Sequence, residues 1–80
     1  MERLIKLIWD FRGPDAEKIA EHHVIHLREY VALEKLPLTL MDKEVINDFH
    51  ALAYLVVNEQ QMREVRDVLK PHRGELYQAK

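Results

Sequence analysis

The chain has 80 residues, of which 14 are acidic and 12 are basic, and its formal net charge is −2 with neutral histidines. This length predicts one domain over residues 1–80. With 48% hydrophobic residues and only two glycines, the composition excludes a disordered or fibrous chain. The near-neutral charge argues against a dedicated DNA or polyanion binder, so we expect no nucleic-acid partner.

Cysteine is absent from the sequence. Its absence excludes disulfide scaffolds, thiolate metal sites and cysteine nucleophiles. It also fits a reducing compartment, and we expect a cytoplasmic protein. Residues 1–9 are apolar but short and charged, well below the roughly 18 apolar residues that suggest a membrane span. We therefore expect no signal peptide and no membrane partner.

The first half of the chain predicts a strand followed by a long helix. Residues 5–11 are rich in Ile, Trp and Phe, and Arg12, Gly13 and Pro14 stop the strand. Pro14 suits the first turn of a helix, because its missing N–H has no partner there. Apolar residues then recur at three- and four-residue steps to about Lys35, and Pro37 ends the helix.

The last third predicts a strand, a helix and a final strand. Residues 51–57 read as a buried strand, and Asn58 is placed to cap the next helix, with Gln61 three positions on. The apolar stripe of that helix is Met62, Val65, Val68 and Leu69. Pro71 and Gly74 close the helix, and residues 74–78 read as a short strand.

Residues 37–50 admit two interpretations. Residues 38–41 could form a strand that turns back near residues 42–43 or 47–48. Alternatively, Thr39 could cap a helix that runs through Val45, Phe49 and Leu52. The hairpin is favoured, because one uninterrupted helix would place Asn58 in its interior, where its side chain could not cap the start of the next helix.

The resulting order is strand, helix, strand, strand, helix, strand. It predicts an α+β fold of the ferredoxin-like βαββαβ type, the split βαβ sandwich, with two helices on one face of a four-stranded antiparallel sheet. The stretches from Trp9 to Lys18 and from Leu69 to Tyr77 resemble those of small bacterial proteins of uncharacterised function. The layout is similar to the dimeric α/β-barrel superfamily, whose members pair two such sheets. That resemblance implies no activity or cofactor, and no residue roles carry over.

Three histidines lie on the predicted long helix. His22 and His26 are four residues apart, and this spacing is a workable half-site for zinc or nickel. His23 lies near the centre of the apolar stripe. The favoured interpretation is a hydrogen-bonded core His23 with His22 and His26 at the surface. A weak metal site, or a catalytic or pH-sensing role, is the alternative.

A second group of residues converges only through the predicted topology. The end of the first strand, the start of the first helix and the loop before the last strand share one edge. That edge would gather Asp10, Arg12, the amides after Gly13, His50, His72 and Arg73. Arginine, histidine and a helix N-terminus can hold a small ligand. The alternative is structural, with Asp10 simply paired to Arg12 or Arg73.

The strands also predict self-association. One side of the first strand carries Ile5, Leu7, Trp9 and Phe11, but Leu4 and Ile8 lie on the other side. The third strand likewise has Leu52, Tyr54 and Val56 opposite its core side. Two helices cover only one face, so we expect a homo-oligomer formed through the open sheet face.

Two function classes remain after these observations. The first is a small oligomeric module that binds a small molecule or a protein and has no evident catalytic machinery. The second is a small enzyme of the dimeric α/β-barrel type, with His50 or His23 as its acid or base. A weak histidine metal-binding protein is a third, less favoured, interpretation. The sequence does not identify a cofactor.

Overall fold

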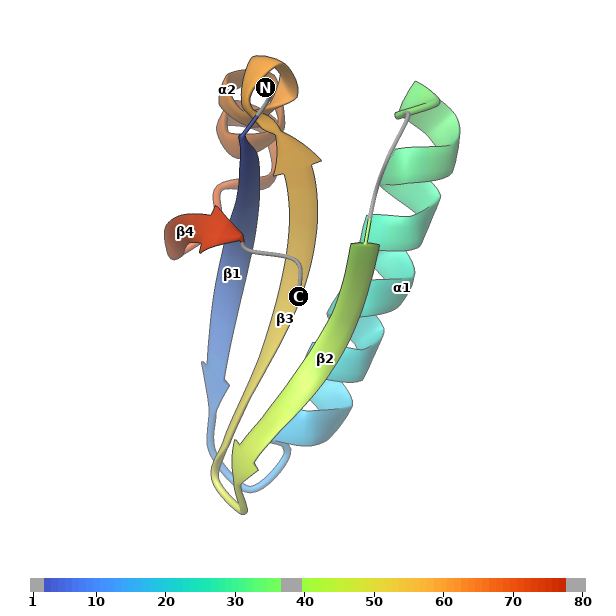
Figure 1. The fold of residues 1–80 in the computed structure, drawn as a ribbon. Coiled ribbons are helices and arrows are strands. Elements are labelled where there is room, and N and C mark those ends of the chain that lie inside the picture. The colour runs from blue at the N-terminus through green and yellow to red at the C-terminus, as the bar shows by residue number, and fades with distance from the viewer. Residues whose placement is uncertain (1–2, 37–39, 78–80) are drawn as a thin grey trace.

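The computed structural model describes residues 3–36 and 40–77, and it has the predicted order of elements (Figure 1). These are β1 (Leu4–Arg12), α1 (Ala16–Glu34), β2 (Leu40–Asn47), β3 (His50–Asn58), α2 (Glu59–Leu69) and β4 (Arg73–Tyr77). The strands form one antiparallel sheet in the order β2-β3-β1-β4. This is the α+β, ferredoxin-like arrangement that the sequence predicts.

The segment that the sequence left open is a hairpin. β2 pairs with β3, and the turn lies at residues 48–49, where the Asn47 side chain accepts the N–H of Phe49 at 2.8 Å. The helix alternative for this segment is therefore wrong. Residues 38 and 39 lie outside the described residues, and the strand begins at Leu40. A bulge between Val45 and Asn47 interrupts the register.

The core lies between the two helices and one face of the sheet. Leu7 and Trp9 of β1 meet Leu55 of β3, and α1 and α2 each add a buried residue, Leu27 and Val65. Because side chains alternate across a strand, the odd-numbered residues of β1 and β3 line this face. In β3, Ala53, Leu55 and Val57 lie in the core, so the predicted open side with Leu52, Tyr54 and Val56 is confirmed for this strand. On α1, Val24 is buried, whereas Ile19 is about half exposed.

Both helices begin at residues that suit a helix start. Gly13 has a φ of +118°, which favours glycine, and it turns the chain from β1 into α1. Its N–H donates to the Phe49 carbonyl at 2.8 Å, so the turn is held to the hairpin tip. At α2, the Asn58 side chain accepts the N–H of Gln61 at 2.9 Å, and the predicted cap is confirmed.

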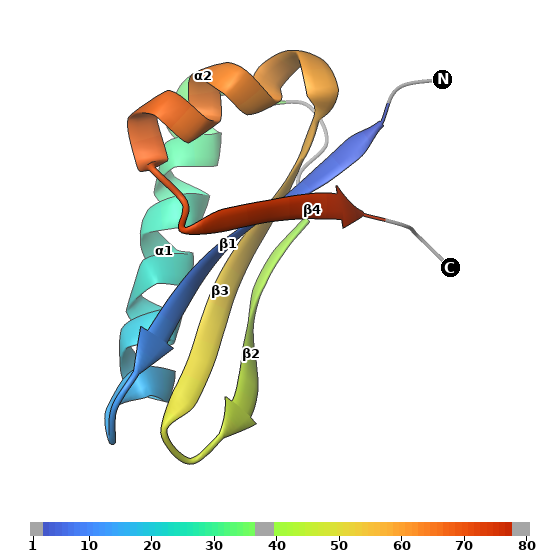
Figure 2. The same ribbon diagram turned by 90° about the vertical axis from the view of Figure 1, so that its left-hand side faces the viewer.

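The two helices do not run alongside each other. α1 packs chiefly on β3 and β2, whereas α2 packs on β1 and β3 near the far end of the sheet. Figure 2 shows α2 lying across one end of the sheet, roughly alongside β4 but with the chain running the opposite way, and steeply inclined to α1. The Trp9 indole N–H donates to the Leu69 carbonyl at 3.0 Å and so fixes the end of α2 to β1. Within residues 3–36 and 40–77, neither helix is long and apolar enough to cross a bilayer.

The open face is less apolar than the sequence suggests. Ile8, Leu52 and Val56 point to this face, yet they are only 1%, 4% and 1% exposed in the single chain. Their register partners on the neighbouring strands, whose side chains share this face, are Arg73 and Tyr54 for Ile8, Asp10 and Glu44 for Leu52, and Lys6 and Leu40 for Val56. Of the patch expected at Leu52, Tyr54 and Val56, only Tyr54 is partly exposed in the single chain.

Candidate functional site

The side chains of Asp10, His50 and Arg73, from three different strands, meet on the open face. Arg73 of β4 donates through Nε to Asp10 Oδ2 at 2.9 Å and through Nη2 to Oδ1 at 3.3 Å. His50 Nε2 of β3 lies 2.9 Å from Asp10 Oδ1. The His50 and Asp10 side chains are only 15% and 18% exposed. Both carboxylate oxygens are thus engaged, and the three residues form a charged row across the sheet.

The electrostatics of this row favour an ionised Asp10. The guanidinium of Arg73, bonded to both oxygens, holds the pKa of Asp10 at about 2 instead of its usual 3.8. Partial burial of the carboxyl group opposes this shift, and the bond to His50 adds to it. Asp10 is therefore a fixed anion at any physiological pH.

His72 completes the group through the backbone. The ring Nδ1 of His72 accepts the backbone N–H of Asp10 at 2.9 Å. The backbone N–H of His72 donates to the Ile8 carbonyl at 2.9 Å. An Nδ1 that accepts a hydrogen bond carries no proton, so the remaining proton of this ring lies on Nε2. The ring also meets Phe11 edge-on, with centroids 6.3 Å apart.

The structure therefore brings together four of the residues expected at this edge and separates two other features from them. Asp10, His50, His72 and Arg73 are in contact. Arg12 is exposed and has no ion pair with this group in the described part of the chain.

The start of α1 lies on the covered face of the sheet, opposite the Asp10 side chain. In addition, the Ala16 N–H donates to the Gly13 carbonyl at 3.1 Å, so this amide is not available to an anion. The expected contribution of the helix start is corrected on both grounds.

The helix histidines take separate places. His23 packs against Trp9 and Phe11, with ring centroids 4.7 and 5.5 Å apart. The expected hydrogen bond is not found, because His23 Nε2 is buried without a partner among the described residues. Burial lowers the pKa of His23 below 6.5, and the charges of His26 and His72 lower it further.

His22 and His26 are exposed, and His26 lies 3.8 Å from Glu29. Among residues 3–36 and 40–77, no three histidine or carboxylate side chains are placed to hold one metal ion.

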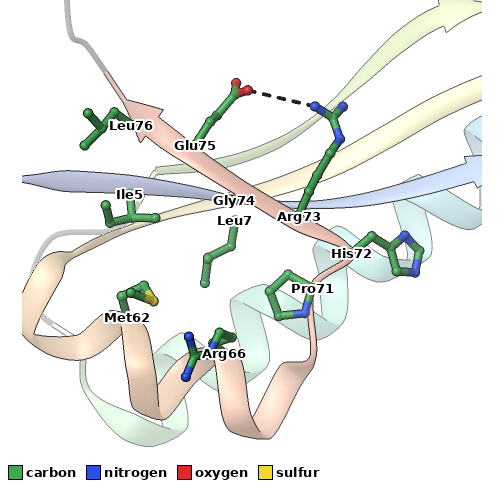
Figure 3. A pocket seen from close by; sticks show the side chains of 10 residues that line it. All are labelled: Ile5, Leu7, Met62, Arg66, Pro71, His72, Arg73, Gly74, Glu75 and Leu76. Atoms are coloured by element: carbon green, nitrogen blue, oxygen red, sulfur yellow. Dashed lines mark ion pairs between the residues drawn. The ribbon is translucent and has the colours of Figure 1, made fainter.

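A pocket between α2 and β4 was not predicted from the sequence. We call it the α2–β4 pocket; its volume is about 470 Å³, and its lining residues are Ile5, Leu7, Met62, Arg66, Pro71, His72, Arg73, Gly74, Glu75 and Leu76. Figure 3 shows Ile5, Leu7 and Met62 on one side of β4, and Arg73 and Glu75 on the other.

Gly74 leaves this pocket open. A Cβ at residue 74 would lie 3.5 Å from Leu7 and 3.8 Å from Ile5, which is ordinary contact distance. Two of the predicted ligand-binding residues, His72 and Arg73, also line the pocket. The one sequence signal for this pocket is Gly74 itself, because a glycine inside a strand often marks a close approach of a ligand or another backbone.

Comparison of the chain with protein-family models, with curated proteins and with solved structures finds no match. The geometry of the two sites is therefore what points to a function.

Proposed function

We propose that the protein is a binding module whose α2–β4 pocket holds a small, mostly apolar molecule with a carboxylate or similar acceptor group. The observation that carries the proposal is an apolar floor, Ile5 and Leu7, left open beside Gly74 at the edge of the sheet. A volume of about 470 Å³ lies within the range of about 300–1,000 Å³ typical of small-molecule sites.

The polar lining supports an anionic or acceptor group on the ligand. Arg66 of α2 lines the pocket, and its only ion pair among the described residues is a loose one, 3.5 Å to the neighbouring Asp67. Its guanidinium therefore keeps donors for a ligand. His72 also lines the pocket, but its ring points away from Leu7 and Met62 (Figure 3), so Arg66 is the donor that the proposal uses. A ligand whose carboxylate lies near Arg66 and whose hydrocarbon part packs on Leu7 would use both the charged and the apolar part of the pocket lining.

Octanoate is a suitable probe, because it joins an apolar tail to a carboxylate. Titration followed by amide chemical shifts is expected to move the signals of Leu7, Gly74 and Leu76. Gly74→Val places a branched side chain against Leu7 and Ile5 without backbone strain, which narrows the pocket at its apolar floor and is expected to weaken binding strongly. A folded Gly74→Val variant that binds octanoate as the wild type does would refute the proposal.

The charge requirement has a matched test on one helix. Arg66→Gln removes a charge-assisted hydrogen bond and is expected to weaken octanoate binding by about tenfold or more. Arg63→Gln makes the same change on α2 at a residue that does not line the pocket, and it is expected to leave the affinity unchanged. Equal effects of the two substitutions would argue against a site at Arg66.

One observation favours the enzyme alternative. The Asp10–His50 pair, 2.9 Å long and mostly buried, is the kind of contact that orients an imidazole for proton transfer. However, neither the α2–β4 pocket nor the smaller hollow between α1 and β2 is lined by His50. A binding module therefore remains the better supported function. The cytoplasmic location and the absence of nucleic-acid and membrane partners stay predictions.

A further inference from the structure

β4 is an edge strand whose outer side can accept another strand. It follows β1 in the order β2-β3-β1-β4, and no strand lies beyond it in the sheet formed by the described residues. The Glu59 N–H donates to the Arg3 carbonyl at 2.9 Å, so odd-numbered residues of β1 turn their backbone groups to β3. Even-numbered residues, among them Lys6 and Ile8, therefore turn theirs to β4.

This alternation fixes which groups of β4 face outward. Lys6 and Ile8 lie opposite Glu75 and Arg73, whose backbone groups consequently face β1. The backbone N–H and C=O groups of Gly74 and Leu76 then point away from the sheet. An unpaired edge of this kind is a template for strand addition.

The side chains of β4 indicate what that added strand is. Arg73 and Glu75 lie on the open face, one on each side of Gly74, and both are about half exposed. Arg73 Nη1 and Glu75 Oε2 are 3.9 Å apart, so the two charged groups lie together above Gly74 (Figure 3). An antiparallel copy of β4, related by a two-fold axis at Gly74, places Arg73 opposite the partner's Glu75 and Glu75 opposite the partner's Arg73.

We propose that two copies of this chain associate through β4, antiparallel and centred on Gly74, so that their sheets join into one of eight strands. In this register, the outward backbone groups of Gly74 bond to the partner's Gly74. Centring the pair on Glu75 or on Arg73 instead would set like charges directly against each other, which is unfavourable.

The opposite edge of the sheet provides an internal comparison. Asp42 and Glu44 share the open face of β2 on either side of Lys43, as Arg73 and Glu75 do around Gly74. The same two-fold pairing centred on Lys43 would oppose Asp42 to the partner's Glu44, both acidic. In addition, Lys43 is bound to Glu17 and Glu21 of α1, at 2.9 and 3.2 Å. Charge therefore favours self-pairing at β4 and opposes it at β2.

Association through β4 also affects the α2–β4 pocket. Leu76, which is 57% exposed, lines the pocket at this edge. In the proposed register it lies opposite the partner's His72 on the covered face, so each copy extends the rim of its neighbour's pocket. A five-residue strand buries less than the roughly 1,000 Å² of a stable complex. We therefore expect a weak dimer that forms reversibly with concentration.

Sedimentation equilibrium of the full chain from micromolar to submillimolar concentration tests the proposal. A monomer–dimer equilibrium is expected, and Glu75→Lys is expected to raise its dissociation constant by about tenfold, since two ion pairs become like-charge contacts. Glu29→Lys makes the same charge change at an exposed residue of α1, away from both edge strands, and is expected to leave the equilibrium unchanged. The amides of Gly74 and Leu76 should exchange more slowly with solvent as concentration rises.

Three results would overturn the proposal. The first is a monomer at every concentration, and the second is an open-ended series of larger species. The third is a dimer that Tyr54→Ser on the open face disrupts but Glu75→Lys does not, which would place the interface on the open face instead. Octanoate binding is measured separately, so a failure of the dimer and a failure of the pocket are distinguishable.

Discussion

At the scale of single residues, two buried or partly buried groups make stability depend on pH. Asp10 is ionised and bonded on both oxygens, whereas His23 is held neutral between aromatic rings. Both have a pKa below the ordinary value, but the physical causes differ. Attraction to Arg73 dominates for Asp10, and burial dominates for His23. Their contributions to stability are therefore lost in different pH ranges.

Asp10→Asn is expected to lower the free energy of unfolding at pH 7 by about 1 kcal/mol. The value is modest because Arg73 is half exposed and solvent screens the pair. The folded pKa of about 2 lies below the unfolded value near 3.8, so the wild type keeps this contribution above pH 4 and loses it as pH falls to 2. Urea denaturation at pH 7, 4 and 2 measures the effect. A wild-type advantage that is equally large at pH 2 would contradict it.

His23→Leu is expected to stabilise the protein by about 1 kcal/mol, because it removes a buried nitrogen without a partner. That corresponds to a rise in Tm of about 4–8 °C for a chain of this size. Because the folded pKa lies below 6.5, the unfolded state binds the proton first as pH falls, and the gain should be larger at pH 5.5 than at pH 7.5. Thermal melts at both pH values check this. His22→Leu on the exposed side of α1 is the control, and an equal gain there would assign the effect to helix propensity.

At the scale of elements, both helices end in the same unfavourable way. Lys35 and Lys70 have φ values of +52° and +49°, and each donates its N–H to a carbonyl four residues back. This left-handed conformation costs an ordinary residue roughly 1–2 kcal/mol and favours glycine. The ends of α1 and α2 are therefore sites where the chain is less stable than it could be.

Lys35→Gly is expected to raise the free energy of unfolding by about 0.5 kcal/mol, the balance of removed strain and greater freedom in the unfolded chain. Lys18→Gly within α1 is the matched control and is expected to lower it by about 1 kcal/mol. Chemical denaturation of both variants gives the comparison. Destabilisation by both substitutions would show that Lys35 is not strained.

Local signals explain why most elements were predictable. Gly13, Pro14 and Asn58 mark helix starts by their own chemistry, and the described strands and helices begin and end close to where the sequence places them. The direction of α2 was not predictable in this way. It depends on how Val65 and Leu69 seat against β1 and on the bond from Trp9, which are contacts between distant segments. The α2–β4 pocket follows from that direction, and so it escaped the sequence pattern.

At the scale of the whole molecule, the charged row at Asp10 was partly foreseeable. The βαββαβ order alone brings residues 10, 50, 72 and 73 to one edge, although they lie up to 63 positions apart. Alternation along a strand could also have separated Asp10 from the start of α1, which lies on the other face. The saturation of both Asp10 oxygens by Arg73 and His50 depends on side-chain conformations that a pattern of residue types does not specify.

The central position of β1 has a consequence for how the chain is made. β1 lies between β3 and β4, which pair with it over Leu4–Arg12 and Leu4–Ile8. During synthesis its apolar residues emerge well before both of its neighbours in the sheet. The β2–β3 hairpin closes locally, whereas β1 has to wait for residues 50–58 and then 73–77. We therefore expect the nascent chain to depend on late, long-range steps, with β4 as the last strand to join.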